Sequence, residues 1–260
     1  IIIITIGAIF APLLAPYPFD LQDPERILSP PGMGHVMGTD RLGRDLFSRL
    51  IYGSRVSLSI GFFTALSALI IGTLYGAVSG YAGGRLDNIM MRGVDVIYSL
   101  PDLLLIILIT IMIGRGITGI FLALSIMSWM TIARLIRGEV LRIKEMPYIE
   151  AERAIGAGDG RILFYHILPN TLGPLIVTLT FRIPAAILAE STLSFIGLGI
   201  SPPFASWGTL ANDGWTTLRF YPHLIVFPGI TIFLTILSLN FIGDWIGDRL
   251  DPQRRERWAA

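Results

Sequence analysis

The chain has 260 residues, of which 53% are hydrophobic and only 15% are charged, and its formal net charge is +1. Its mean hydropathy of +0.67 is far above that of a soluble domain of this length. The small net charge gives no electrostatic case for nucleic acid, and the lack of cysteine excludes disulfides and thiol chemistry. The composition therefore predicts a membrane protein.

Apolar runs predict about six transmembrane helices, because the hydrocarbon core of a bilayer is about 30 Å thick. The first run, Ile1 to about Leu14, begins abruptly and is interpreted as the remainder of a longer first helix, with a signal-peptide core as the alternative. The other predicted spans are residues 56–81, 100–113, 117–136, 171–196 and 223–246. These runs predict an all-α, polytopic fold.

The segment before the second span carries a helical pattern. Thr39 or Asp40 can cap a helix, and Leu42, Leu46 and Leu50 then fall on one face. This pattern predicts an amphipathic helix that lies at the membrane surface and leads into the second span.

Small residues follow one face of the second span, where Gly72, Gly76 and Gly80 are spaced four apart. Such a stripe lets another helix approach closely in a bilayer. It therefore predicts a site of helix packing, with a direct role in a translocation pathway as the alternative.

Basic residues indicate the orientation of the spans. If both termini are cytoplasmic, twelve Lys and Arg residues fall in inside segments and seven in outside segments. Inside loops of membrane proteins are enriched in these residues. The charge distribution therefore favours cytoplasmic termini.

A charged, glycine-broken segment separates the fourth and fifth spans and cannot be embedded in lipid. Pro147 suits a first helical position, and Glu150 and Glu152 favour the positive end of that helix. The glycines of 156–160 should stop it, and a second short helix, 161–168, is expected to end at Pro169. Asn170 or Thr171 can cap the next span. The result is a helix-turn-helix knob that requires a soluble partner.

This segment resembles the EAA loop of ABC-importer permeases, which docks on the ATPase subunit. The family pattern is Glu-Ala-Ala, three residues, Gly, nine residues, a hydrophobe, one residue and Leu-Pro. The spacing is kept here, although Glu152 replaces the second Ala and His166 takes the hydrophobic position. The resemblance assigns ATPase coupling to Glu150, Ala151, Glu152, Ala154, Gly156, Leu168 and Pro169.

Three further strings resemble the dipeptide, oligopeptide and nickel permeases, specifically the second of their two paired permease subunits. They are residues 38–49, residues 190–208, and residues 240–244 with 249–252. Together with the EAA loop, the matches run from about Gly38 to Asp251.

The resemblance implies a type I ABC importer permease fold in the cell membrane. The implied partners are a homologous second permease subunit, two ABC ATPase subunits and an extracytoplasmic solute-binding protein. ATP and magnesium would be bound by the ATPases, so no cofactor is expected in this chain. The expected substrate is a di- or oligopeptide, with glutathione or nickel as alternatives.

The corresponding layout has three parts. Residues 1–55 hold the first helix and the extracytoplasmic amphipathic segment. Residues 56–250 form the permease core of five spans, with the coupling loop at 137–170, and residues 251–260 form a cytoplasmic tail.

Enzymatic and metal-binding alternatives find little support. The sequence contains neither Gly-x-Ser-x-Gly nor His-Glu-x-x-His, and its three histidines lie in loops or at a membrane edge. Met33, His35 and Met37 alternate, but two thioethers and one imidazole make an incomplete metal site. Lys144, the only lysine, is not in a P-loop, so the energy for transport must come from another polypeptide. A receptor or channel is the remaining class.

Two charged residues of the fifth span are candidates for the translocation pathway or its gate. Arg182 lies roughly 16 Å from Thr171 along a helix, close to the bilayer centre, where an unpaired arginine is costly. Glu190 is eight residues further, too far to pair with Arg182 directly. Arg182 is expected to attract the carboxylate of a passing peptide, or alternatively to pair with an acid of the partner permease. Glu190 is expected to belong to the outer gate, and Pro184 to mark a bend.

Overall fold

The computed structural model describes residues 1–250, and the predicted tail, 251–260, lies outside the described residues. Within them, four helical segments are long and apolar enough to cross a membrane: α3 (Leu46–Ala82), α6 (Ile117–Lys144), the run Asp159–Leu198 and α11 (His223–Leu250). A fifth crossing is made only if α4 (Gly84–Tyr98) and α5 (Asp102–Ile113), which are bent by 86°, form one broken span. The prediction of an all-α, multi-span fold is confirmed.

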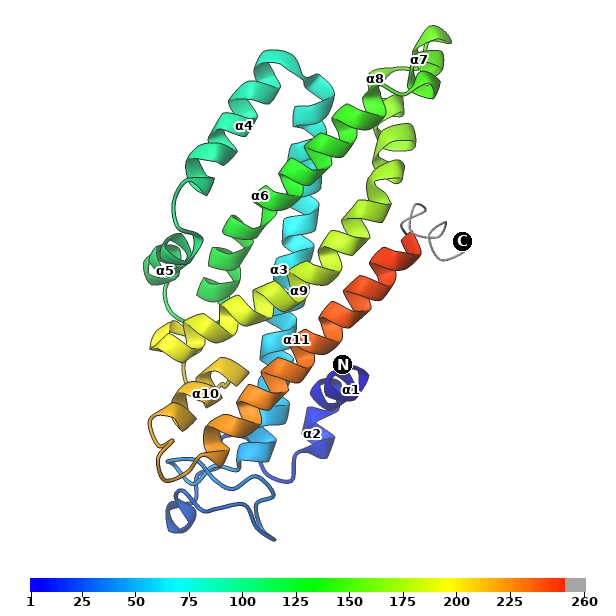
Figure 1. Ribbon diagram of the computed structural model, residues 1–260. Coiled ribbons are helices and arrows are strands. Elements are labelled where there is room, and N and C mark those ends of the chain that lie inside the picture. Colours follow the sequence, from blue (N-terminus) through cyan, green and yellow to red (C-terminus); the bar gives the residue numbers. More distant parts are fainter. Residues whose placement is uncertain (251–260) are drawn as a thin grey trace.

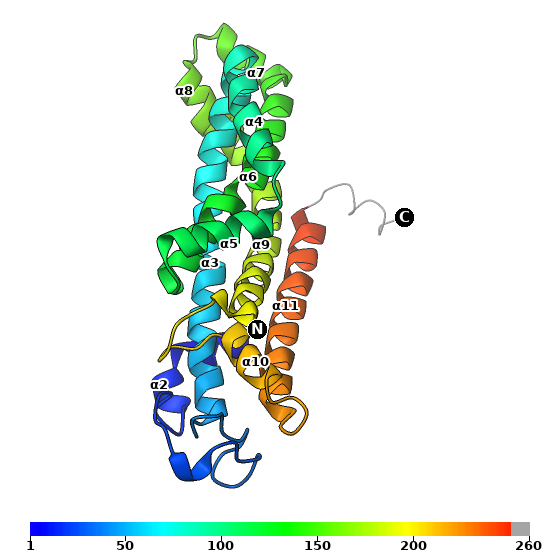
Figure 2. The same cartoon turned by 90° about the vertical axis from the view of Figure 1, so that its left-hand side faces the viewer.

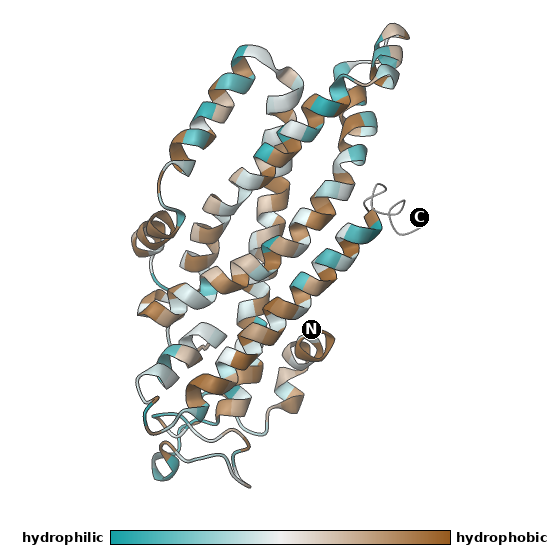
Figure 3. Ribbon diagram, in the orientation of Figure 1, coloured by the Kyte–Doolittle hydropathy of each residue, from teal (hydrophilic) through white to brown (hydrophobic). Residues whose placement is uncertain are grey.

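The long helices lie side by side in an elongated bundle (Figures 1 and 2). The short helices α7 (Pro147–Ala154) and α8 (Asp159–Arg161) project at one end, and α10 (Trp207–Trp215) lies toward the other. Apolar residues dominate the middle of the long helices (Figure 3). Within Asp159–Leu198, the π-helical turn η2 (Ile162–Ile167) and the 3₁₀ turn η3 (Leu168–Thr171) lead into α9 (Leu172–Leu193), and the π-helical turn η4 (Ser194–Leu198) follows it.

The N-terminal apolar run forms two short helices, α1 (Ile2–Ile9) and α2 (Ala11–Leu14), which pack against α3. Ala8 and Ala11 are buried. A 3₁₀ turn, η1 (Pro24–Arg26), follows in the long connection to α3.

The predicted amphipathic surface helix is wrong, because α3 itself begins at Leu46. Its cap is Asp45, whose Oδ2 accepts a hydrogen bond of 2.7 Å from the backbone N–H of Ser48. Asp45 Oδ1 lies 2.8 Å from His35 Nδ1, so this histidine is engaged in the fold. The second span is therefore one continuous helix that starts ten residues before the predicted one.

The reason is the side chain of Asp40, which holds a turn where a helix was expected. Its Oδ1 accepts hydrogen bonds from the backbone N–H groups of Leu42, at 2.8 Å, and Arg44, at 3.0 Å. Aspartate side chains that bond nearby backbone compete with helix formation in this way. Thr39 instead bonds to the backbone of Ser29.

The glycine stripe of α3 packs against α6, as predicted. A Cβ atom on Gly72 would lie 2.6 Å from the carbonyl oxygen of Trp129, and one on Gly76 would meet the carbonyl oxygen of Ala133 more closely still. Gly80 is equally confined by α6. Only residues without a side chain permit this approach of the two backbones.

Gly76→Ala should therefore lower the stability of the purified chain, by about 1–3 kcal/mol if it behaves as an overpacked core substitution. The matched control is Gly138→Ala in α6, where a Cβ atom meets nothing within 4 Å. Thermal unfolding followed by tryptophan fluorescence in detergent measures both. An equal midpoint for the two variants would contradict the packing role of the stripe.

Sequence analysis left α4 unassigned because its charged residues lower its hydropathy. It is tied to the bundle by Asp87, which is buried and lies 2.6 Å from both Nε and Nη2 of Arg137 in α6. Ser79 of α3 donates a 2.5 Å hydrogen bond to the same carboxylate. Three helices are thus joined at one buried ion pair.

Candidate functional site

The knob between α6 and α9 is a helix, a sharp turn and a second helical segment. Gly156 in the turn has φ +88°, a conformation that other residues rarely adopt. Its N–H donates to the carbonyl of Arg153 at 3.0 Å, and that of Ala157 donates to the carbonyl of Glu152 at 3.0 Å. The turn predicted at the 156–160 glycines is confirmed. Its backbone conformation requires a glycine at position 156.

The base of the knob is well packed. Ile149 of α7 and Ile162 and Ile167 of η2 are fully buried. They share one apolar cluster with Val140 and Ile143 of α6. The knob is therefore fixed to the end of the bundle.

The outer surface of the knob is different, because it presents large apolar side chains to its surroundings. Exposed fractions are 44% for Tyr148, 78% for Ile155, 59% for Phe164 and 77% for Tyr165. An apolar surface grouped on a rigid projection is typical of a protein-binding site.

The predicted end of the second helix at Pro169 is wrong. The chain passes through the π-helical turn η2 and the 3₁₀ turn η3, which contains Pro169, into α9 without a break. A proline lacks an N–H and clashes with the carbonyl four residues back, and local π and 3₁₀ turns relieve both problems. Consequently Asn170 and Thr171 do not cap a new helix, and their side chains bond back to the carbonyls of His166 and Leu168.

The predicted coupling residues lie together on the knob, but Glu150 does not stabilise it internally. Its side chain is exposed and has no hydrogen bond or ion pair with the described residues. The two departures from the family pattern meet, since Glu152 Oε2 lies 3.6 Å from His166 Nε2. Ala151, Ala154, Gly156 and Pro169 are exposed, and Leu168 is half-buried.

Arg182 lines a cavity of about 240 Å³ in the middle of the bundle. It makes no hydrogen bond or ion pair within residues 1–250, although Tyr98 and Asp102 are close enough to interact with it electrostatically. The cavity is formed by α3, α5, α6, α9 and the end of α4, through Thr64, Ala65, Tyr98, Asp102, Leu103, Ile106, Leu124, Met127, Ser128, Thr131, Arg182, Ala185, Ala186 and Ala189.

Asp102 is a member of this cavity that sequence reasoning missed. It is exposed and occupies the first position of α5, directly after the break that bends α4 and α5 by 86°. The available signal was an acid placed between Pro101 and a long apolar run. The cavity thus carries one positive and one negative side chain.

Glu190 lies elsewhere, fully buried where α3, α9 and α10 meet. Its carboxylate accepts hydrogen bonds from the hydroxyls of Ser57, at 3.0 Å, and Ser194, at 2.7 Å. Ser57 in turn accepts a 3.2 Å bond from the backbone N–H of Trp207, at the start of α10. Glu190 therefore joins α10 to two long helices, and as predicted it does not pair with Arg182.

Sequence comparison places this architecture in a known family. Residues 72–256 match the model of the binding-protein-dependent transport system inner membrane component, which covers α6, the knob, α9 and α11. The chain belongs to this family. It is thus a membrane permease subunit of a transport system.

Curated relatives and solved structures agree with this assignment. The dipeptide transport system permease protein DppC of Bacillus subtilis is 46% identical over 95% of this chain and 78% of the relative. The oligopeptide transport system permease protein OppC of the same organism is 41% identical over 98% and 84%. The MetNI methionine ABC transporter, in an inward-facing conformation, superposes with a TM-score of 0.64 at 19% identity, covering 79% of this chain and 98% of that chain. The last likeness shows the type I permease fold.

Proposed function

We propose that the chain forms half of the translocation pathway of an ABC importer for short peptides, beside a homologous second permease. Two ABC ATPases would supply the energy, and they would bind the ATP and magnesium. An extracytoplasmic solute-binding protein would deliver the peptide. Family membership supports the transport role, and the names of the relatives support the peptide.

The observation that supports coupling to the ATPases is that the knob has a buried base and exposes large apolar side chains on its outer surface. Tyr148, Ile155 and Phe164 are exposed on the knob, which projects at one end of the bundle (Figure 1). Aromatic residues are enriched in the parts of protein surfaces that bind another protein. Glu150, Ala151, Glu152, Ala154, Gly156, Leu168 and Pro169 are the proposed coupling residues.

Uptake into vesicles that hold the whole complex tests the substrate. ATP-dependent accumulation of labelled di- and tripeptides is expected, and Ni²⁺ should not accumulate. Glutathione is a second candidate, because a glutathione transport system permease protein, GsiD of Pectobacterium atrosepticum, is 40% identical over 95% of this chain. Accumulation of Ni²⁺ alone would refute the proposed peptide specificity.

Within the pathway, Arg182 is proposed to attract the carboxylate of the passing peptide. Its cavity has hydroxyl groups and apolar walls around a single guanidinium, with Asp102 as the one carboxylate, and an intramembrane arginine facing a cavity is typical of a substrate pathway. Glu190 is proposed to belong to the outer gate, as the residue that holds α10 against α3 and α9. Because it is fully buried here, it would act by fixing α10 rather than by touching substrate.

The proposed orientation puts the knob in the cytoplasm and α10 outside. Because the chain has no cysteine, single cysteines report it directly. Ser201, in the loop between η4 and α10, is exposed. At the knob, a side chain on Gly158 meets nothing within 4 Å.

An impermeant thiol reagent added to intact cells should label Ser201→Cys and spare Gly158→Cys. Permeabilised cells provide the control, because both variants should then react. The opposite pattern in intact cells would reverse the orientation and exclude coupling through the knob.

A further inference from the structure

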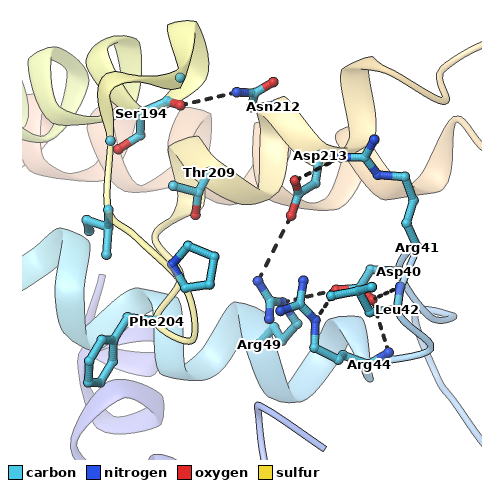
Figure 4. A pocket seen from close by; sticks show the side chains of 14 residues that line it. Asp40, Arg41, Leu42, Arg44, Arg49, Ser194, Phe204, Thr209, Asn212 and Asp213 are labelled. Atoms are coloured by element: carbon cyan, nitrogen blue, oxygen red, sulfur yellow. Dashed lines mark hydrogen bonds and ion pairs between the residues drawn. The ribbon is translucent and has the colours of Figure 1, made fainter. Parts of the chain in front are cut away.

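A second cavity, of about 500 Å³, lies at the end of the molecule opposite the knob. It is bounded by the beginning of α3, the loop that precedes it, the loop after α9 and α10 (Figure 4). Its volume is within the range of small-molecule sites. Charged residues and Leu42 lie on one side and Phe204 on the other (Figure 4), and the apolar Ile200 and Pro202 also line the cavity.

Arg49 is the central charged residue of this cavity and is only 3% exposed. Its Nε lies 3.4 Å from Asp40 Oδ2, and its Nη2 lies 4.0 Å from Asp213 Oδ2. Neither contact is a hydrogen bond, and its Nε and Nη1 have no hydrogen-bond partner among the described residues. A buried guanidinium with unused donors is costly unless an anion completes its contacts.

The nearby carboxylates do not supply that completion. Asp40 already accepts two backbone N–H groups on Oδ1, and its Oδ2 accepts a 2.7 Å hydrogen bond from Arg44 Nε. Asp213 Oδ1 is 3.3 Å from Arg41 Nη2. Three arginines therefore share two aspartates, and the cavity retains an excess of one positive charge.

We propose that this cavity binds the free C-terminal carboxylate of a short peptide. Arg41, Arg44 and Arg49 would supply the positive charge, since guanidinium groups are the side chains best suited to a planar carboxylate. The peptide's last side chain would lie against Phe204 and Ile200. The choice of a peptide rests on the function proposed above, whereas the preference for a carboxylate comes from the arginines.

Calorimetric titration of the purified full-length chain tests this site. All measurements use the Arg182→Gln background, so that the carboxylate contact proposed there does not contribute. The probes are Ala-Phe, its C-terminal amide and N-acetyl-Ala-Phe. The two probes with a free carboxylate should bind with similar affinity, and the amide should bind at least about tenfold more weakly, as expected for one charged hydrogen-bonded contact.

Variants with opposite expected effects separate binding from misfolding. Arg49→Gln should weaken binding of N-acetyl-Ala-Phe at least about tenfold. Asp213→Asn, at a half-buried position, removes a competing negative charge and should strengthen it severalfold. Arg219→Gln changes an exposed arginine outside the cavity and should leave it unaltered.

Equal binding of the amide and the free acid would overturn the proposal, as would unchanged or weaker binding in Asp213→Asn. Docking of the solute-binding protein that depends on Arg49, without peptide binding, would assign the cavity to an acidic side chain of that partner instead. Peptide binding to the chain without uptake by the complex would refute the proposed function and leave this site standing. Uptake by the complex without peptide binding to the chain would refute this site and leave the proposed function standing.

Discussion

Gly156→Asp should abolish ATP-dependent uptake while leaving the chain inserted in the membrane. The substitution forces a side chain into φ +88°, which costs about 1–2 kcal/mol in the turn that orients the knob. A Cβ atom at this position meets nothing of the chain within 4 Å, so the new carboxylate points toward the surface proposed for the ATPase. Uptake, and ATP hydrolysis stimulated by substrate, are measured on the reconstituted complex.

Gly158→Asp is the matched control, because it adds the same charge two residues away at φ −72°. It should retain most of the uptake. Glu150→Lys should also abolish coupling, since Glu150 is exposed and available to a partner, whereas Glu145→Lys, at another exposed glutamate before α7, should not. Normal substrate-stimulated hydrolysis in both Gly156→Asp and Glu150→Lys would remove the knob from the mechanism.

Arg182→Gln should reduce uptake of peptides with a free carboxylate by about tenfold to a hundredfold, the loss expected for a hydrogen bond to a charged group. Uptake of the corresponding amidated peptides should change much less. The physical reason is that Arg182 carries the positive charge of its cavity and has no hydrogen bond or ion pair within residues 1–250. Competition between free and amidated peptides in vesicles measures the ratio of their uptake rates directly.

Two controls separate this role from assembly of the permease pair. Arg182→Lys should keep part of the preference, because the charge remains. Arg85→Gln removes an exposed arginine of α4 that does not line the cavity, so it should leave the preference intact. Equal loss for both peptide types with an intact complex would refute the pathway role of Arg182. Loss of the complex would favour its pairing with an acid of the partner permease.

The long apolar spans could be predicted because the bilayer imposes a length and a composition that single residues cannot override. The ends of the spans could not. α3 extends to Leu46 because Asp45 caps it, and α4 escaped notice because its charged residues lower its hydropathy, while the pairing of Asp87 with Arg137 of α6 appears only in the fold. α10 begins at a capping box formed by Ser206 and Thr209, a weaker signal than the usual Ser and Glu pair.

The candidate site likewise has parts that could be predicted from the sequence and parts that could not. The knob was predictable because a turn needs glycine and a spacing, both of which are local. The cavities were not, because Asp102 and Arg182, or Arg49 and Asp213, come together only through packing of distant helices. The contact of Glu152 with His166 joins two substitutions that looked unrelated in the sequence.

The uninterrupted passage from the knob into α9 has a mechanical consequence. Leu168, Arg182 and Glu190 lie on one continuous helical segment. It has π-helical turns at its two ends, Ile162–Ile167 and Ser194–Leu198. Helical backbone bonding stiffens α9, in which Pro184 removes one hydrogen bond, while turns of a different hydrogen-bond register are the points where the segment can rotate or bend. Because Arg182 and Glu190 lie on the same helix, a displacement of α9 should change the central cavity and the attachment of α10 at the same time.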